Sequence, residues 1–206
     1  MTDGVRAPVV VGVDGSPASE QAVRIAAAEA VGQGRGLRIL HAFAWTEAGW
    51  TDGTHPRDAA EHLLDHAASE ARAAAPDVAA VTDVAEGDPV NVLLRAAASA
   101  DLLAIGDGGL SAYGCLPTGA RAVRIAAEAP CSVLVARDTA AKPGPVLVGI
   151  NGTRDAEHAL GHAFDIAAHR GVDLVILHVT EADSGPAVDP PQPEIDPALQ
   201  EKVSSW

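Results

Sequence analysis

The stretch from Asp101 to Val123 reads DLLAIGDGGLSAYGCLPTGARAV. Its apolar run, Leu102–Ile105, is typical of a buried strand, and residues 120–128 have the apolar spacing of a helix. The loop between them is rich in glycine, namely Gly106, Gly108, Gly109, Gly114 and Gly119. Glycine lets the backbone approach an anion closely, and the unpaired N–H groups that begin a helix attract one. Strand, loop and helix together predict a phosphate-binding loop, with a nucleotide as its ligand.

Strands and helices are predicted to alternate around this stretch. The other strands are expected at Val9–Val13, Leu37–Phe43, Val78–Val84 and Ser132–Ala136. Helices are expected between them, each with an apolar stripe on one face: Val23, Ala26, Ala27 and Ala30; Leu64, Ala67, Ala68 and Ala71; Val90, Leu93, Leu94 and Ala97. Ser16 and Asp88 stand where they can cap two of these helices. Five strands and four helices in alternation indicate an α/β fold with a doubly wound, five-stranded parallel sheet.

Ligands of such a sheet bind beyond the carboxyl ends of its strands, where the direction of winding reverses. If the first and fourth strands are neighbours, Asp14 and the loop that begins at Gly106 meet at that point. Asp14 is open to two interpretations: an acceptor for ribose hydroxyls or an exocyclic amine, or a residue that caps its own turn. Arg121 and Arg124 are either phosphate ligands or ordinary surface arginines.

The composition excludes several classes of protein. A hydrophobic content of 48% over 206 residues is enough for a folded core. The formal net charge of -14 argues against nucleic acid as a partner, and no apolar run is long enough to cross a membrane. The N-terminus lacks the features of a signal peptide, so we expect a cytoplasmic protein. Cys115 and Cys131 are expected to be free thiols, and the histidine pairs on helices are expected to be solvated rather than to bind a metal.

Residues 146–182 repeat residues 9–45 without a gap, at an offset of 137. Matched positions include Gly12 and Gly149, Asp14 and Asn151, Ser16 and Thr153, and His41 and His178. The sequence therefore predicts a tandem protein, with a complete domain at 1–137, a linker at 138–145 and a partial second domain at 146–206. We expect the second domain to lack the later strands and the glycine loop. The chain would then hold one nucleotide site at most.

Three features together resemble the universal stress protein family: VVVGVDGS from Val9, ILHAF ending at Phe43, and the glycine loop before APCSVLVAR. In the nucleotide-binding branch of that family the loop reads Gly, two residues, Gly, nine residues, Gly, and then Ser or Thr. Gly106, Gly109 and Gly119 keep this spacing, but Ala120 stands in place of the hydroxyl residue. Losing one hydrogen bond would weaken binding by up to about tenfold without abolishing it.

The resemblance implies an adenine nucleotide alpha hydrolase-like fold that binds ATP, with or without Mg²⁺. It implies that Asp14 contacts the adenosine part, that a backbone group near Ala42 contacts the adenine, and that the loop contacts the phosphates. The nucleotide-binding residues that it implies in this chain are Gly12, Val13, Asp14, Ala42, Gly106, Gly109, Gly119, Ala120 and Arg121. It also implies a homodimer that forms through the last strand, Ser132–Ala136.

Two functions stay open from the sequence alone. One is an ATP-binding regulatory protein of the stress response, and the other is a nucleotide-free scaffold that acts through dimerisation and protein contacts. The glycine spacing and Asp14 favour the first, whereas Ala120 and the partial second domain favour the second. An enzyme is not expected, because Gly114–Gly119 lacks the Lys and Ser or Thr of a P-loop and no GxSxG motif occurs. Any ATP hydrolysis would be slow and incidental to binding.

Overall fold

The computed structural model describes residues 6–43, 56–107, 121–137 and 144–178. These residues belong to two compact parts, Met1–Lys142 and Pro143–Trp206, which we call unit 1 and unit 2. Within the described ranges, no helix is both long enough and apolar enough to cross a membrane.

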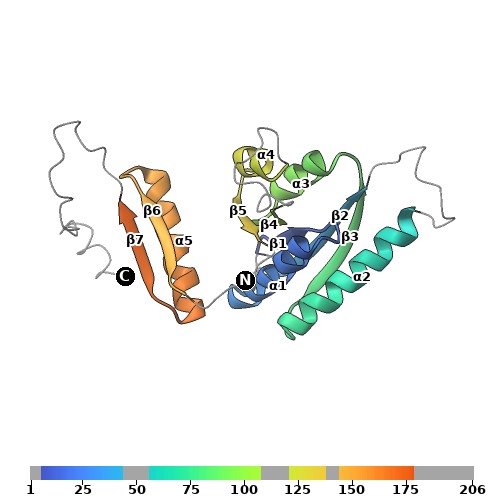
Figure 1. Cartoon of the computed structure of the whole chain (residues 1–206), viewed down its shortest axis with the longest axis horizontal. Coiled ribbons are helices and arrows are strands. Elements are labelled where there is room, and N and C mark those ends of the chain that lie inside the picture. Colours follow the sequence, from blue (N-terminus) through green and yellow to red (C-terminus); the bar gives the residue numbers. More distant parts are fainter. Residues whose placement is uncertain (1–5, 44–55, 108–120, 138–143, 179–206) are drawn as a thin grey trace, which may run out of the picture. The chain divides into compact units, whose positions relative to one another are not determined.

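Unit 1 alternates strands and helices along the chain (Figure 1). Its described elements are β1 (Val9–Gly12), α1 (Pro17–Gly32), β2 (Leu37–Phe43), α2 (Pro56–Ala74), β3 (Ala80–Glu86), α3 (Pro89–Ala97), β4 (Leu102–Gly106), α4 (Arg121–Glu128) and β5 (Ser132–Ala136). The strands form one parallel sheet in the order β3-β2-β1-β4-β5. The predicted α/β class and five-stranded parallel sheet are confirmed, and the winding reverses between β1 and β4.

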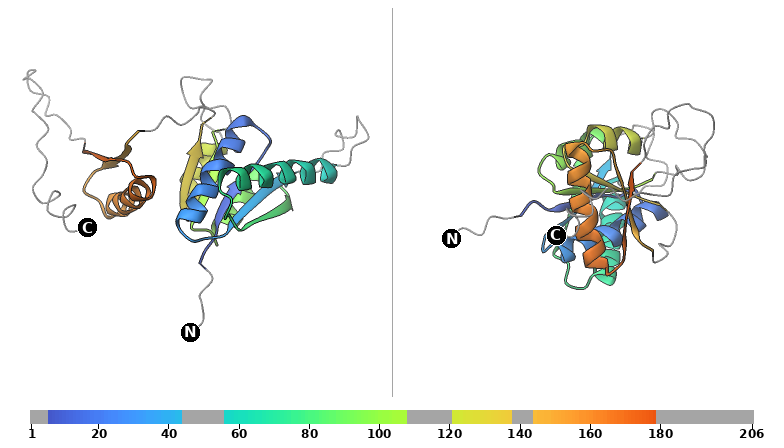
Figure 2. Two further views of the ribbon diagram at one scale, coloured as in Figure 1. Left: turned by 90° about the horizontal axis from the view of Figure 1, so that it is seen from below. Right: turned by 90° about the vertical axis from the view of Figure 1, so that its left-hand side faces the viewer.

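Side chains that alternate along the buried strands divide the core of unit 1 into two layers. Val9 and Val11 of β1 face α1 and α2, which lie side by side on one face of the sheet (Figure 2). Val10 faces the opposite way, into the layer under α3 and α4. All three valines are fully buried, so β1 is a central strand with both faces covered.

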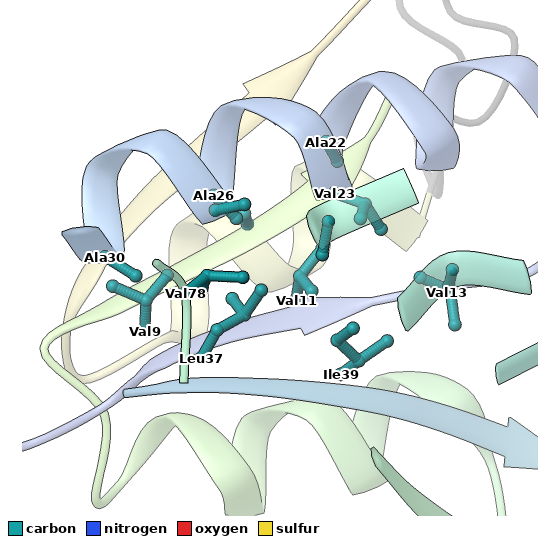
Figure 3. Close-up of a cluster of buried hydrophobic side chains, with 14 of the residues drawn as sticks. Val9, Val11, Val13, Ala22, Val23, Ala26, Ala30, Leu37, Ile39 and Val78 are labelled. Carbon is teal, nitrogen blue, oxygen red and sulfur yellow. The ribbon is translucent and has the colours of Figure 1, made fainter. Parts of the chain in front are cut away.

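Small residues let α1 pack closely on the sheet. Ser16 caps the helix, because its hydroxyl accepts a hydrogen bond from the N–H of Ser19 at 3.2 Å. The predicted stripe Val23, Ala26, Ala27 and Ala30 is fully buried. Figure 3 shows Val23, Ala26 and Ala30 on the side of α1 that faces the β1 and β2 side chains. The periodicity of the sequence therefore identified the correct face of α1.

Four strand boundaries differ from the sequence prediction by one or two residues. Two of them are strand ends that lie later than predicted: β3 ends at Glu86 rather than at Val84, and β4 ends at Gly106 rather than at Ile105. β3 begins at Ala80 rather than at Val78, because the N–H of Val78 closes a turn onto the carbonyl of Ala75 at 3.0 Å. β1 ends at Gly12, one residue earlier than expected. The N–H of Val13 still donates to the carbonyl of Leu40 in β2, so the hydrogen bonding of the strand continues to the predicted end.

The buried face of α3 is wider than predicted. Asp88 caps this helix as expected, its carboxylate accepting from the N–H of Asn91 at 3.1 Å. However, Leu94 of the expected stripe is only partly buried, while Val92 and Ala96 are buried. The physical reason is that α3 packs against α4 as well as against the sheet, so a second side of the helix is covered.

Unit 2 repeats the first strand, helix and strand of unit 1. Its described elements are β6 (Val146–Ile150), α5 (Arg154–Arg170) and β7 (Leu174–His178), and the two strands are parallel. Val146 pairs with Leu174, just as Val9 pairs with Leu37 at the matched positions of unit 1. Thr153 caps α5 as Ser16 caps α1. The repeat in sequence is therefore also a repeat in local structure and in strand register.

Candidate functional site

A cavity of about 500 Å³ lies at the carboxyl ends of β1, β2 and β4. Its size falls in the range of roughly 300–1,000 Å³ that small-molecule sites occupy. It is lined by strand ends and by two helices, with these described residues: Gly12, Val13, Asp14, Leu40, Ala42, Pro89, Val90, Leu93, Ile105, Gly106, Asp107, Arg121, Ala122 and Ile125. The chain leaves β1 and β4 in opposite directions along the sheet, which opens a crevice between their ends.

Asp14 follows β1 and is exposed at the cavity. Its Oδ1 accepts hydrogen bonds from the N–H of Ser16 at 3.0 Å and from the Ser16 hydroxyl at 2.6 Å. Burial raises the pKa of the Asp14 carboxyl, but the hydrogen bonds from Ser16 and Ser19 outweigh it and leave the pKa below its usual value. The group is therefore an anion at neutral pH. The interpretation that Asp14 caps its own turn is confirmed. Asp14 also lines the cavity, and its contact with a ligand stays a prediction.

The backbone of Ala42 is a second polar feature of the cavity. The pairing of β1 with β2 reaches Leu40, whose carbonyl accepts from the N–H of Val13 at 3.0 Å. Alternate residues of a strand direct their backbone groups to the same side, so Ala42 points its N–H and C=O the same way as Leu40. Since β1 has already ended at this level, these groups are directed past its end, toward the cavity that Ala42 lines. A donor and an acceptor side by side match the edge of a purine base.

His41 fixes the end of β1 next to Asp14. Its Nδ1 lies 2.7 Å from the carbonyl oxygen of Val13. A carbonyl can only accept, so Nδ1 carries the proton and donates it. The sequence showed His41 only as a repeated position, because its partner is 28 residues away along the chain. The contact makes His41 a positioning residue for Val13 and for the carboxylate that follows it.

Two glycines at the cavity are explained by close packing. A Cβ atom at Gly106 would lie 2.8 Å from backbone atoms of Ala18 and Ser19, in the first turn of α1. A Cβ atom at Gly12 would lie 2.8 Å from the side chain of Leu93. The sequence assigned Gly106 to phosphate binding. The structure gives it a further role, because no other residue allows α1 to lie this close to β4.

The two arginines of α4 are placed differently. Arg121 lines the cavity, is exposed, and forms no ion pair within the described part of the chain. Arg124 donates its Nε–H to Glu128 at 3.0 Å and an Nη2–H to Asn91 at 3.4 Å, and it does not line the cavity. Of the two candidate phosphate ligands, the structure therefore places Arg121 at the site and Arg124 outside it.

Sequence reasoning missed Asp107 and the apolar wall of the cavity. Asp107 is 2% exposed and lines the cavity, and its N–H donates to the carbonyl of Ala136 at 2.8 Å. An acidic residue inside a loop that is expected to bind an anion was the available signal. Val90, Leu93 and Ile125 supply the apolar wall. Their helical spacing indicated core packing, and nothing in that spacing distinguishes a core face from a cavity wall.

Some predicted residues lie outside the described part of the chain, namely Gly109, Cys115, Gly119 and Ala120. Cys131 is a free, partly buried thiol, and burial raises its pKa, which disfavours the reactive thiolate. Among the described residues, no group of three or more His, Cys, Asp or Glu is placed to hold a metal ion.

Comparison with known proteins gives a consistent result. A sequence model of the universal stress protein family matches residues 6–137 and 143–205. A universal stress protein of Mycolicibacterium smegmatis is 30% identical over 217 residues, which cover 96% of this chain and 74% of that protein. The sequence similarity thus extends over both copies of the repeat.

Solved structures agree. A universal stress protein in complex with cAMP is 28% identical, with a TM-score of 0.54, over 66% of this chain and 100% of its own. A universal stress protein from Archaeoglobus fulgidus matches 85% of this chain and 68% of its own, with a TM-score of 0.69. Its identity of 20% makes that likeness one of fold alone. With the family pattern present in both units and the fold in agreement, this chain belongs to the universal stress protein family.

Proposed function

We propose that unit 1 binds an adenine nucleotide in the cavity and that its occupancy regulates the contacts of the protein in a stress response. The observation that carries this proposal is the placement of Asp14 and the Ala42 backbone at neighbouring strand ends of one cavity. A carboxylate suits the hydroxyls of a ribose, and a paired N–H and C=O suit an adenine edge. The related protein that binds cAMP supports the same class of ligand.

The remaining walls are consistent with this ligand. Val90, Leu93, Ile105 and Ile125 give the cavity an apolar side that can pack against a base. The first turn of α4 also lines it, and the unpaired N–H groups of a helix start attract an anion. ATP, with or without Mg²⁺, is the ligand predicted from the family resemblance. The described residues supply partners for the adenosine portion, and the start of α4 with Arg121 supplies one for a phosphate.

The role that we propose is binding rather than catalysis. The absence of a P-loop in the sequence is what supports it. Release of phosphate from ATP should therefore stay slow even when the site is saturated.

Calorimetric titration of the full chain with adenosine, AMP and ATP tests the proposal, after a denatured sample has been checked for co-purified nucleotide. We expect saturable binding of at least one of these ligands. Asp14→Ala should weaken it about tenfold or more, because a hydrogen bond to a charged group contributes roughly 1.5–3 kcal/mol. Asn151→Ala is the matched control at the repeated position, and it should leave the affinity unchanged.

Failure of all three ligands to bind, with no nucleotide in the denatured sample, would favour the second candidate function. That candidate is a nucleotide-free scaffold that acts through protein contacts. The position of β5 favours a scaffold that is a homodimer, because β5 is the last strand in the sheet order and Val135 on it is exposed. Pairing of two copies through β5 stays a prediction from the family resemblance.

A further inference from the structure

We infer that His41 keeps the backbone N–H of Ala42 free for a hydrogen-bond acceptor on the ligand. The imidazole takes the carbonyl of Val13, which this N–H would otherwise meet in the ladder between β1 and β2. The inference deepens the proposed function and rests on it where the ligand is concerned. It makes His41 a specificity-determining residue that acts through the backbone of its neighbour.

The hydrogen bonds between β1 and β2 follow the alternation of a parallel ladder. The N–H groups of Val9 and Val13 donate to the carbonyls of Gly36 and Leu40, at 2.9 and 3.0 Å. In a parallel pair, a residue that donates in this way also accepts from the residue two positions further along the partner strand. The carbonyl of Val13 would therefore accept from the N–H of Ala42 if the ladder continued regularly.

The structure departs from the regular ladder at this step. The pairing ends with Gly12 opposite Leu40. The carbonyl of Val13 instead accepts from Nδ1 of His41 at 2.7 Å. The bonds from β2 to β3 use the alternate residues of β2, so they do not involve the N–H of Ala42. Within the described part of the chain this N–H has no acceptor, and Ala42 lines the cavity.

Unit 2 contains the same histidine but a different strand end. Ile150 and His178 match Val13 and His41, and they pair with each other in the ladder between β6 and β7. No hydrogen bond joins the His178 ring to Ile150, both of which the structure describes. The ladder thus continues one step further in the unit where the ring leaves the carbonyl free. This is the difference expected if the imidazole decides where the pairing ends.

A free N–H beside a carbonyl determines what the ligand must offer. The carbonyl of Ala42 points the same way as its N–H and accepts a hydrogen bond. Adenine carries its amino group between two ring nitrogens, N1 and N7, each of which is an acceptor. An analogue with a C–H group in place of that nitrogen fills the same space but leaves the N–H unpaired. The site should therefore reject this analogue only while His41 holds Val13.

The first measurement is amide hydrogen exchange of the full chain without ligand, followed for single residues by NMR. The N–H of Ala42 should exchange at least about a hundredfold faster than that of Leu40, which points the same way but lies inside the ladder. His41→Leu should slow the exchange of Ala42 about tenfold or more, because its N–H can then pair with Val13. His41→Asn should leave it fast, because the amide nitrogen of Asn can donate from the position of Nδ1. Equal protection of Ala42 and Leu40 in the wild type would overturn the inference, whether or not the variants fold.

The second measurement is a calorimetric titration of the full chain with adenosine, 1-deazaadenosine and 7-deazaadenosine. The wild type should bind adenosine about threefold to tenfold more tightly than one of the two analogues. His41→Leu should lose this preference, and His41→Asn should retain it. His178→Leu is the matched control at the repeated position, and it should behave as the wild type. Equal binding of all three ligands by the wild type, or a preference that survives in His41→Leu, would overturn the inference.

The two measurements separate failure of the inference from failure of the proposed function. If adenosine does not bind, the proposed function falls, and with it the part of the inference that concerns the ligand. The exchange of Ala42 in the ligand-free chain still decides whether His41 holds the strand end open.

Discussion

Positions 137 residues apart in units 1 and 2 share local structure but differ in burial. Leu40 is 1% exposed and its counterpart Leu177 is 49% exposed, while Val10 is 0% and Leu147 is 64% exposed. In unit 1 these side chains lie in the layer under α3 and α4. In the described part of unit 2, α5 is the helix that packs on β6 and β7. The repeated segment thus specifies strand, cap, helix and register, whereas burial of the second sheet face depends on later elements.

The turn after the first strand is also repeated in the two units, with Asp14 in unit 1 and Asn151 in unit 2. Asn151 accepts hydrogen bonds from the N–H of Thr153 at 3.2 Å and from its hydroxyl at 2.7 Å. These are the contacts that Asp14 makes with Ser16 in unit 1. The same two hydrogen bonds therefore form with an amide or with a carboxylate, so the turn does not require the charge of Asp14. That leaves the charge available for a ligand.

The largest expected effect compares Leu40→Ala with Leu177→Ala. Truncating the buried Leu40 should lower the free energy of unfolding of unit 1 by about 2–5 kcal/mol, because it removes apolar contacts and leaves a cavity. Leu177→Ala should lower that of unit 2 by about 1 kcal/mol or less, because half of the side chain is already in water. Native-state amide exchange measures each unit separately, at the amides of β1 and β2 and of β6 and β7.

Each leucine variant is the control for the other, since the side chain and the strand position are the same. An equal loss of stability in the two variants would mean that the face of β6 and β7 that carries Leu147 and Leu177 is covered in solution.

A smaller effect is expected for the matched glycines Gly12 and Gly149. A Cβ at Gly12 meets the terminal methyl groups of Leu93, which must move, so Gly12→Ala should destabilise unit 1 by about 1 kcal/mol or less. A Cβ at Gly149 meets nothing within 4 Å, so Gly149→Ala should stabilise unit 2 by roughly 0.4–1 kcal/mol by restricting its unfolded chain. The same exchange experiment measures both. A loss of stability in Gly149→Ala would show that the matched position in unit 2 is also crowded.

The sequence predicted the elements of this fold well because they depend on neighbours along the chain. The stripe of α1 and the caps Ser16 and Asp88 follow from local periodicity and capping chemistry. The pairing of β1 with β4 was one of the few arrangements that the rules of winding left open. The width of the buried face of α3 could not be predicted, because it depends on contact with α4, which lies beyond the next strand.

The site was predicted only in part, for a similar reason. Gly12, Val13, Asp14, Ala42, Gly106 and Arg121 line the cavity, as expected from strand ends and from the family resemblance. Their role in binding stays a prediction. The packing role of Gly106 depends on how close α1 approaches, and the burial of Asp107 depends on how the surrounding elements pack. Neither the approach of α1 nor the burial of Asp107 is encoded in a local sequence pattern. A motif can therefore locate such residues without giving their function.

The smallest expected effect is a pH dependence that separates the two turns. The pKa of Asp14 is lowered in the folded protein by its hydrogen bonds, which outweigh the opposing effect of burial. Its ionised form therefore stabilises unit 1 above the unfolded pKa of about 3.9, and this contribution is lost as the pH falls through the lower, folded value. The difference in melting temperature between the wild type and Asp14→Asn should be present at pH 6 and shrink below pH 4. Asn151 makes the same contacts without a titrating group, so Asn151→Asp should give unit 2 this pH dependence. A difference between the wild type and Asp14→Asn that stays constant with pH would mean that the turn of unit 1, like that of unit 2, does not depend on charge.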